Sequence, residues 1–269
     1  MWDKNLKFQK NKSIAIFDSG FGGLFIMKEI IKVLPHEDVI YFGDNIRAPY
    51  GDRSEKEIIK HSLRIADFLN SLNIKVLILG CNTISACAYK SLKKSLKIDI
   101  FEIISPSVKK ILKLNRKIGI LATKATIFSK IYQRKILKYN KKMDLSFFSC
   151  PLFVSLVEKG VFDEKILEEA VRYYLKNIES KKIEIFFLGC THYIFFKEIL
   201  KKISNKKIID SVLECVEEVK NNLKEKASFL NIPKYMFYTT KDKKEFKRIA
   251  EKILQMEDIN VREKKNIIN

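Results

Sequence analysis

Residues 76–86 read "VLILGCNTISA", an apolar run that ends in Gly80 and Cys81 and continues into small polar residues. Residues 185–195 read "IFFLGCTHYIF" and repeat this arrangement around Cys190. Each run is typical of a strand that is buried on both faces, and each Gly-Cys turn stands just before a predicted helix. The sequence therefore predicts two similar units, each with a cysteine where a strand passes into a helix.

The remaining chain alternates short apolar runs with amphipathic helical stretches. Strands are predicted at 13–17, 38–43 and 75–80, and the same order returns at 117–122, 144–150 and 183–189. Helices are predicted between them, among others at 54–72, 83–96 and 126–139. Beyond residue 208 the sequence predicts a helix at 212–230, a strand at 235–240 and a helix at 242–254. This alternation favours parallel sheets with helices packed against them.

The predicted fold is α/β, with two pseudo-symmetric, doubly wound domains, mainly parallel sheets and an active site between the domains. The first domain is expected to comprise residues 1–98 and 209–269, and the second residues 99–208. No Pro- or Ser-rich linker separates the two units, so we expect them to pack closely.

Composition restricts the class of protein. The chain has 269 residues, of which 46% are hydrophobic, so a substantial core is expected and global disorder is disfavoured. No apolar run is long enough to cross a bilayer, and the basic N-terminus lacks the apolar segment of a signal peptide. The five cysteines form no CxxC pair and are expected to be free thiols in the cytoplasm, with Cys87, Cys150 and Cys215 as small buried residues.

The net charge of +20 raises the question of a nucleic-acid partner. Its lysines are spread along the whole chain, at the polar positions of predicted helices, and no zinc finger or RNA-binding aromatic motif accompanies them. A dedicated nucleic-acid-binding function is therefore disfavoured.

The two Gly-Cys turns suggest a chemical role. Ligands of open α/β sheets bind at the carboxyl ends of the strands, and a helix N-terminus lowers the pKa of a thiol. Two domains that face each other would place Cys81 and Cys190 on opposite sides of one ligand. Two acid/base groups on opposite faces of a carbon atom are what stereoinversion by proton transfer requires.

Other polar residues follow the ends of predicted strands. Asp18 and Ser19 precede a glycine-rich turn that is neither a dinucleotide-binding nor a phosphate-binding loop. For the glycines alone, a tight turn with a helix cap is the favoured explanation. Asp44 follows the second strand and leads to a Pro-Tyr-Gly turn, which by itself is also compatible with a solvent loop. His192 lies two residues after Cys190, which favours an acid/base role for it.

Several motifs together resemble the glutamate racemase family. They occur in the family's order, between about residues 14 and 255: "DSGFGGL" (18–24), "DNIRAPYG" (44–51), "CNTISA" (81–86), "CPLFVSLVEKG" (150–160), "GCTHY" (189–193) and "IIDS" (208–211). The resemblance implies a cofactor-independent enzyme that interconverts L- and D-glutamate, supplies D-glutamate for peptidoglycan synthesis, needs neither pyridoxal phosphate nor a metal, and forms a homodimer.

The same resemblance implies roles for individual residues. Cys190 would deprotonate L-glutamate and Cys81 would deprotonate D-glutamate. Asp18 and His192 would assist the neighbouring thiols, with Asp44 and Glu158 as further acid/base or polar support. Substrate would be bound by Asp18, Ser19, Pro49, Tyr50, Gly51, Asn82, Thr83, Thr191 and His192.

Two alternatives remain open at this point. An aspartate racemase or related amino-acid isomerase shares the paired cysteines, and the "APYG" loop is expected to set the length of the side-chain pocket. An additional binding role is less favoured; it is raised by the positive charge and by the gyrase inhibition found in some members of the family.

Overall fold

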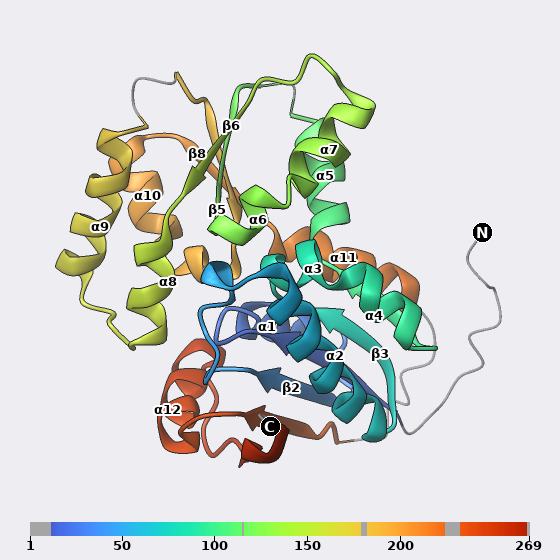
Figure 1. The fold of residues 1–269 in the computed structure, drawn as a ribbon. Helices are drawn as coiled ribbons and strands as arrows, with labels where there is room; N and C mark the ends of the chain where they lie inside the picture. The colour runs from blue at the N-terminus through green and yellow to red at the C-terminus, as the bar shows by residue number, and fades with distance from the viewer. Residues whose placement is uncertain (1–11, 115, 179–181, 224–231, 268–269) are drawn as a thin grey trace.

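Two parallel β-sheets organise the protein in a computed structural model, which describes residues 12–114, 116–178, 182–223 and 232–267 (Figure 1). The larger sheet has the strand order β10 (Val261–Glu263), β9 (Tyr235–Thr239), β2 (Val39–Gly43), β1 (Ser13–Asp18), β3 (Ile74–Leu79) and β4 (Asp99–Glu102). The smaller sheet has the order β6 (Leu145–Ser149), β5 (Ile118–Ala122), β7 (Ile185–Gly189) and β8 (Lys207–Asp210).

The predicted duplication is visible in the strand order. The sequence β2-β1-β3-β4 in the larger sheet corresponds to β6-β5-β7-β8 in the smaller one, and all the paired strands run parallel. The register agrees as well, because Leu79 pairs with Glu102 in one sheet and Leu188 pairs with Asp210 in the other. Cys81 and Cys190, each two residues further on, are therefore at equivalent positions.

Helices cover both faces of each sheet, as a doubly wound fold requires. On the larger sheet, α1 (Leu24–Val33), α5 (Ile104–Leu112), α11 (Val212–Leu223) and α12 (Lys243–Leu254) pack on one face, and α2 (Glu55–Ser71), α3 (Asn82–Cys87) and α4 (Tyr89–Ser95) on the other. On the smaller sheet, α7 (Ile131–Tyr139) packs on one face and α8 (Pro151–Glu158), α9 (Glu164–Lys176) and α10 (Lys197–Ser204) on the other. Helix α2 begins with the predicted capping box of Ser54 and Glu57.

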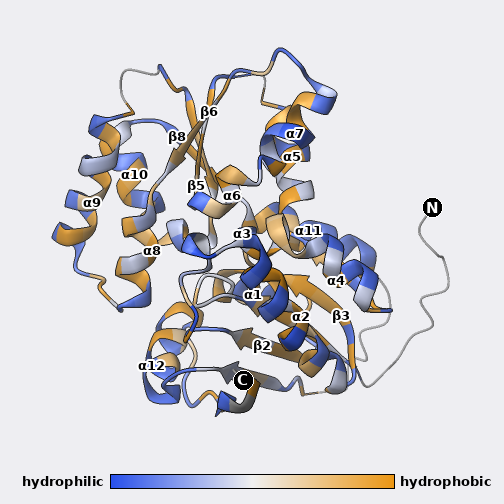
Figure 2. Ribbon diagram, viewed as in Figure 1, coloured by the Kyte–Doolittle hydropathy of each residue, from blue (hydrophilic) through white to orange (hydrophobic). Residues whose placement is uncertain are grey.

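Successive residues of a strand pack into different hydrophobic clusters, one on each face of the sheet. Ile14 and Ile16 belong to one cluster, whereas Ala15 and Phe17 belong to the cluster beneath α2 and α3. The first cluster continues without interruption into Ile120 and other residues of the smaller sheet. The two units therefore share a core, which agrees with the expected close packing. Figure 2 shows the apolar strands inside and the hydrophilic faces of the outer helices.

The predicted domain boundaries differ from the sheet boundaries by a few residues. Strand β4 at 99–102 belongs to the larger sheet, although residues from 99 onward were assigned to the second domain, and β8 extends the smaller sheet to Asp210. The chain passes between the sheets through α5 and α11, which pack against each other. Strand β4, "DIFE", and strand β10, "VRE", are missed by sequence reasoning because they are short and at least half of their residues are charged.

Two predicted helices are divided in the structure. The predicted helix at 83–96 forms α3 and α4, which meet at Ala88. The predicted helix at 126–139 forms α6 (Lys124–Phe128) and α7, because Lys130 adopts a left-handed conformation with φ 53°. Part of the predicted helix at 212–230 lies outside the described residues. Within the described chain, no helix is both long and apolar enough to cross a membrane.

Candidate active site

The first Gly-Cys turn places Cys81 at the N-terminus of α3, directly after β3, with 6% of the residue exposed. Its Sγ lies 3.4 Å from Oγ of Ser19, which follows the adjacent strand β1. Burial, together with the charge of Asp18, raises the pKa of the Cys81 thiol to about 12, and the hydrogen bonds to Ser19 and the Ile84 N–H oppose this only in part. The sequence predicted a lowered pKa at a helix N-terminus; desolvation outweighs that effect here.

The second Gly-Cys turn places Cys190 after β7 and before the 3₁₀ helix η3 (Thr191–Phe196), again with 6% exposed. Its Sγ is 4.0 Å from Nδ1 of His192. The opposite ring nitrogen, Nε2, is 2.5 Å from Oε1 of Glu158 on α8. Burial alone would lower the pKa of His192, but its hydrogen bonds to Cys190 and Glu158 raise that pKa well above the usual range. Cys190 and Glu158 thus contact the two different nitrogens of the His192 ring.

The two thiols belong to one site. Ser19 lies 3.4 Å from the Cys81 sulfur, and its neighbour Asp18 accepts a hydrogen bond from Thr191, the residue after Cys190. They come from equivalent strand ends of opposite units. The two turns therefore bring one thiol from each unit to the same part of the molecule.

Asp18 connects the two turns. This fully buried residue ends β1; its Oδ1 accepts a hydrogen bond from the Gly20 N–H at 2.8 Å, and its Oδ2 accepts one from Oγ1 of Thr191 at 3.4 Å. Burial raises the pKa of Asp18, and the charge of His192 opposes the shift. Asp18 thus links the two turns: it directly precedes Ser19, which contacts Cys81, and it accepts a hydrogen bond from Thr191, which directly follows Cys190.

The glycines after Asp18 allow the second unit to approach closely. A Cβ atom on Gly20 would lie 1.9 Å from Oε1 of Glu158, and one on Gly22 would lie 2.3 Å from Oγ1 of Thr191. Neither glycine has a positive φ, so close contact rather than backbone conformation requires them. Glu158 also accepts hydrogen bonds from the Phe21 N–H and from Nδ2 of Asn45, both at 3.2 Å.

Asp44 is the centre of a second polar cluster at the Pro-Tyr-Gly turn, and its N–H donates to the carbonyl oxygen of Asp18 at 3.1 Å. Its carboxylate accepts hydrogen bonds from Nη1 of Arg47 at 2.9 Å, from Oη of Tyr50 at 2.6 Å and from Oγ1 of Thr240 at 2.8 Å. All three donors are side chains of the protein, so Asp44 holds the turn in place.

The turn itself begins at Pro49, which follows a cis peptide bond, and continues into the 3₁₀ helix η1 (Tyr50–Asp52). Gly51 lies against the other unit, since a Cβ atom there would be 2.6 Å from Cβ of Thr123.

Hydrogen bonds join the start of α3 to the second unit. Oγ1 of Thr83 is 2.9 Å from Oγ1 of Thr123 and 3.4 Å from Oγ1 of Thr126, and the latter two are 3.0 Å apart. Next to them, Oη of Tyr132 donates to Oδ1 of Asn82 at 2.7 Å. These buried hydroxyl groups can redirect their hydrogens toward a carboxylate.

Sequence reasoning missed Thr123, Thr126 and Tyr132. The register contains a signal for the first of them: Phe17 and Leu121 pair with Leu79 and Leu188 respectively, so Thr123 is the counterpart of Ser19. A comparison of all strand ends between the two units would have identified Thr123. Thr126 and Tyr132 lie on helices, and only their packing brings them to the site.

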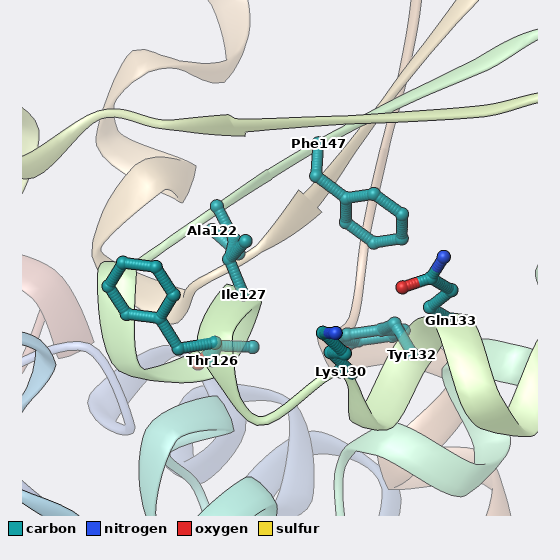
Figure 3. Close-up of a pocket in the computed structure, with 8 residues that line it drawn as sticks. Ala122, Thr126, Ile127, Lys130, Tyr132, Gln133 and Phe147 are labelled. Atoms are coloured by element: carbon teal, nitrogen blue, oxygen red, sulfur yellow. The ribbon is translucent and has the colours of Figure 1, made fainter.

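A small cavity lies beside this hydroxyl cluster (Figure 3). Its volume is about 150 Å³, and its lining includes Thr126, Tyr132 and Phe147 but neither site cysteine. Figure 3 shows the Phe147 ring on the opposite side of the cavity from Tyr132. Within the described residues, no group of three or more His, Cys, Asp or Glu side chains is arranged to hold a metal ion.

His192 is expected to make the stability of the protein pH-dependent. Its pKa is raised from 6.5 on folding, so its protonation favours the folded state below about pH 6.5, and this contribution is lost as the pH rises through the raised pKa. Urea unfolding of the wild type and of His192→Asn should therefore give a larger difference in unfolding free energy at pH 6 than at pH 9. A difference that grows toward pH 9 would contradict the assigned protonation.

Comparisons with known proteins agree with this geometry. The chain matches the family model described as Asp/Glu/Hydantoin racemase over residues 24–219. The glutamate racemase of Thermoanaerobacter sp. (strain X514) is 38% identical over 248 residues, 90% of this chain and 93% of that protein. The glutamate racemase of Persephonella marina (strain DSM 14350 / EX-H1) is 45% identical over 204 residues, 74% of this chain and 78% of that protein.

The fold also matches solved structures. The crystal structure of glutamate racemase from Francisella tularensis subsp. tularensis SCHU S4, in complex with D-glutamate, superposes with a TM-score of 0.88 and 36% sequence identity. The match covers 94% of this chain and 97% of that one. The likeness therefore extends over nearly the whole chain, and the residues matched by the family model include both Gly-Cys turns.

Proposed function

We propose that this chain, which belongs to the Asp/Glu/Hydantoin racemase family and within it to the glutamate racemases, interconverts L-glutamate and D-glutamate with two cysteine bases. The observation that carries the proposal is the equivalent placement of Cys81 and Cys190 at the facing strand ends of two duplicated units. The proposed reaction uses only side chains and backbone groups of the protein.

The proton transfers follow from this placement. The Cys190 thiolate takes the α-hydrogen of L-glutamate as a proton, and the electron pair of the broken C–H bond stays on the substrate. The Cys81 thiol then donates its proton to the opposite face of the α-carbon, which yields D-glutamate. The reverse reaction begins with Cys81 as thiolate and Cys190 as thiol.

Surrounding groups support these transfers. The His192 imidazolium, hydrogen-bonded to Glu158, stabilises the thiolate of Cys190. Asp18 is placed to receive the substrate ammonium group, which would compensate its buried charge. The free N–H groups at the starts of α3 and η3, with the hydroxyl groups of Thr83 and Thr123, are suited to the two carboxylates.

Solvent isotope exchange tests the proposal. Purified protein in D₂O, given L-glutamate, should produce D-glutamate that carries deuterium at the α-carbon, and the optical rotation should fall to zero. Relative rates on glutamate and aspartate separate the proposal from the aspartate racemase alternative. If both glutamate enantiomers are recovered unchanged, the proposed function is wrong.

The cellular assignments belong to the same proposal. D-glutamate supply for peptidoglycan, action in the cytoplasm and a homodimeric state are inferred from the resemblance to glutamate racemases. Rescue of a bacterial strain that requires D-glutamate tests the first, and light scattering of the purified protein tests the last. Binding to gyrase or nucleic acid stays a less favoured prediction of the sequence.

Gly20→Ala is expected to disturb the site without touching a proposed base. The new Cβ would overlap Oε1 of Glu158, so the carboxylate must move away from His192. We expect kcat/KM for racemisation to fall at least about tenfold, with a destabilisation of about 1–3 kcal/mol. Gly80→Ala is the matched control, because its nearest contact would be 3.2 Å and lies away from Glu158. Equal losses in both variants would contradict this explanation.

A further inference from the structure

We propose that Tyr132, which belongs to the opposite unit, is a positioning residue that fixes the orientation of Asn82 beside Cys81. This inference rests on the proposed function. Tyr132 lies on α7, is 2% exposed, and donates a 2.7 Å hydrogen bond to Oδ1 of Asn82. Asn82 is 1% exposed, is the first residue of α3 and directly follows Cys81 in the chain. A side chain of one unit therefore holds the residue next to the proposed base of the other.

The Asn82 amide is held at both ends. Its Oδ1 accepts from Tyr132, and its Nδ2 donates to Oγ of Ser211 at 3.3 Å. Ser211 lies where the chain crosses between the sheets, between β8 and α11. An amide nitrogen has two hydrogens, so one remains for a carboxylate of the substrate. Tyr132 thus fixes the amide orientation in which the donor hydrogen is available beside Cys81.

Packing and the hydroxyl group together hold Tyr132 in place: the ring belongs to the buried core, and the hydroxyl group also interacts with the Ser107 side chain. One contact of the ring is edge-on to Phe187, with centroids 5.8 Å apart. Elsewhere the Tyr132 side chain borders the cavity of about 150 Å³ shown in Figure 3. Loss of the hydrogen bond would leave Oδ1 of Asn82 without this donor, so the Asn82 amide would no longer be held in one orientation. Tyr132→Phe keeps the apolar ring and removes only the hydroxyl group.

The consequence for catalysis is directional. In the proposed mechanism Cys81 removes the α-proton from D-glutamate. When the reaction starts from L-glutamate, Cys81 instead donates a proton to the α-carbon. The equilibrium constant of a racemisation is one, so kcat/KM must change equally in both directions. The primary isotope effect does not have to change equally in both directions, because deuterium at the α-carbon of the substrate reports only the first proton abstraction.

The experiment compares Tyr132→Phe with Tyr139→Phe, a matched change on the same helix at a residue that is 72% exposed. For Tyr132→Phe we expect kcat/KM to fall about fivefold to 150-fold in both directions, the range for an unpaired buried hydrogen-bonding group. The primary isotope effect should rise with [2-²H]-D-glutamate and stay equal or fall with [2-²H]-L-glutamate. Tyr139→Phe should match the wild type.

A double-mutant cycle with Asn82→Ala completes the test. Once the Asn82 amide is absent, Tyr132→Phe should cost less than twofold further, because the two residues act as one unit. Additive losses, or isotope effects that change equally for both enantiomers, would overturn the positioning role. If the wild type is active and Tyr132→Phe behaves like Tyr139→Phe, only this inference fails. An inactive wild type would refute the proposed function itself.

Discussion

Cys81→Ala and Cys190→Ala are each expected to lower kcat/KM for glutamate racemisation at least about 10³-fold in both directions. A general base contributes about 10²–10⁴-fold to a rate, and each thiol also serves as the acid on the opposite face. Neither cysteine can take over the role of the other, because inversion requires one acid/base group on each face of the α-carbon. A coupled assay for the product enantiomer measures both directions.

The two variants are expected to differ in the exchange that they retain. Cys81→Ala keeps Cys190 and should still wash solvent deuterium into L-glutamate with retention of configuration. Cys190→Ala should do the same only with D-glutamate. Proton NMR of the α-position in D₂O distinguishes the two patterns. This opposite selectivity is a direct consequence of bases that approach from different domains.

Cys87→Ala is the matched control for these variants. Cys87 ends α3 and is buried, but it lies away from the strand ends. Its thiol pKa is also raised by burial, to about 11, so a raised pKa alone does not identify a proposed base. The control should retain nearly full activity. If Cys87→Ala and Cys81→Ala lose activity equally, the two-base assignment is wrong.

His192→Asn is expected to lower kcat/KM about 10²-fold, with its main effect on the Cys190 side. The substitution removes the charge that lies 4.0 Å from Cys190 Sγ and is hydrogen-bonded to Glu158. A less stabilised thiolate slows proton abstraction from L-glutamate, so the primary isotope effect should rise with [2-²H]-L-glutamate. This direction is the opposite of the one expected for Tyr132→Phe.

Glu158→Gln provides the partner measurement. It keeps the shape of the side chain and removes the charge that helps to protonate His192. We expect a smaller loss than for His192→Asn, with the same preference for the L-glutamate isotope effect. An isotope effect that rises with D-glutamate in either variant would contradict the pairing of His192 with Cys190.

The main features of the fold follow from local patterns. Buried apolar runs such as those before Cys81 and Cys190 are long and continuous, so their strands were predicted within one or two residues. Repetition of the run and its Gly-Cys turn indicated a duplication, and the strand order confirms it. The short charged strands β4 and β10 gave no such signal, since pairing with a neighbour, and not their composition, makes them strands.

Local sequence and tertiary structure contribute differently to the site. The residue types at the strand ends, with Asp18 and both cysteines, are written in the sequence, because parallel strands bring their carboxyl ends to one edge. The protonation preferences of these residues, and their partners in the opposite unit, cannot be predicted from the sequence. Burial reverses the pKa shift expected for Cys81 at a helix N-terminus, and Tyr132 reaches Asn82 only because α7 packs against α5, a helix that connects the two sheets. Desolvation and contacts between distant segments exist only once the chain is folded, so short-range patterns carry no trace of them.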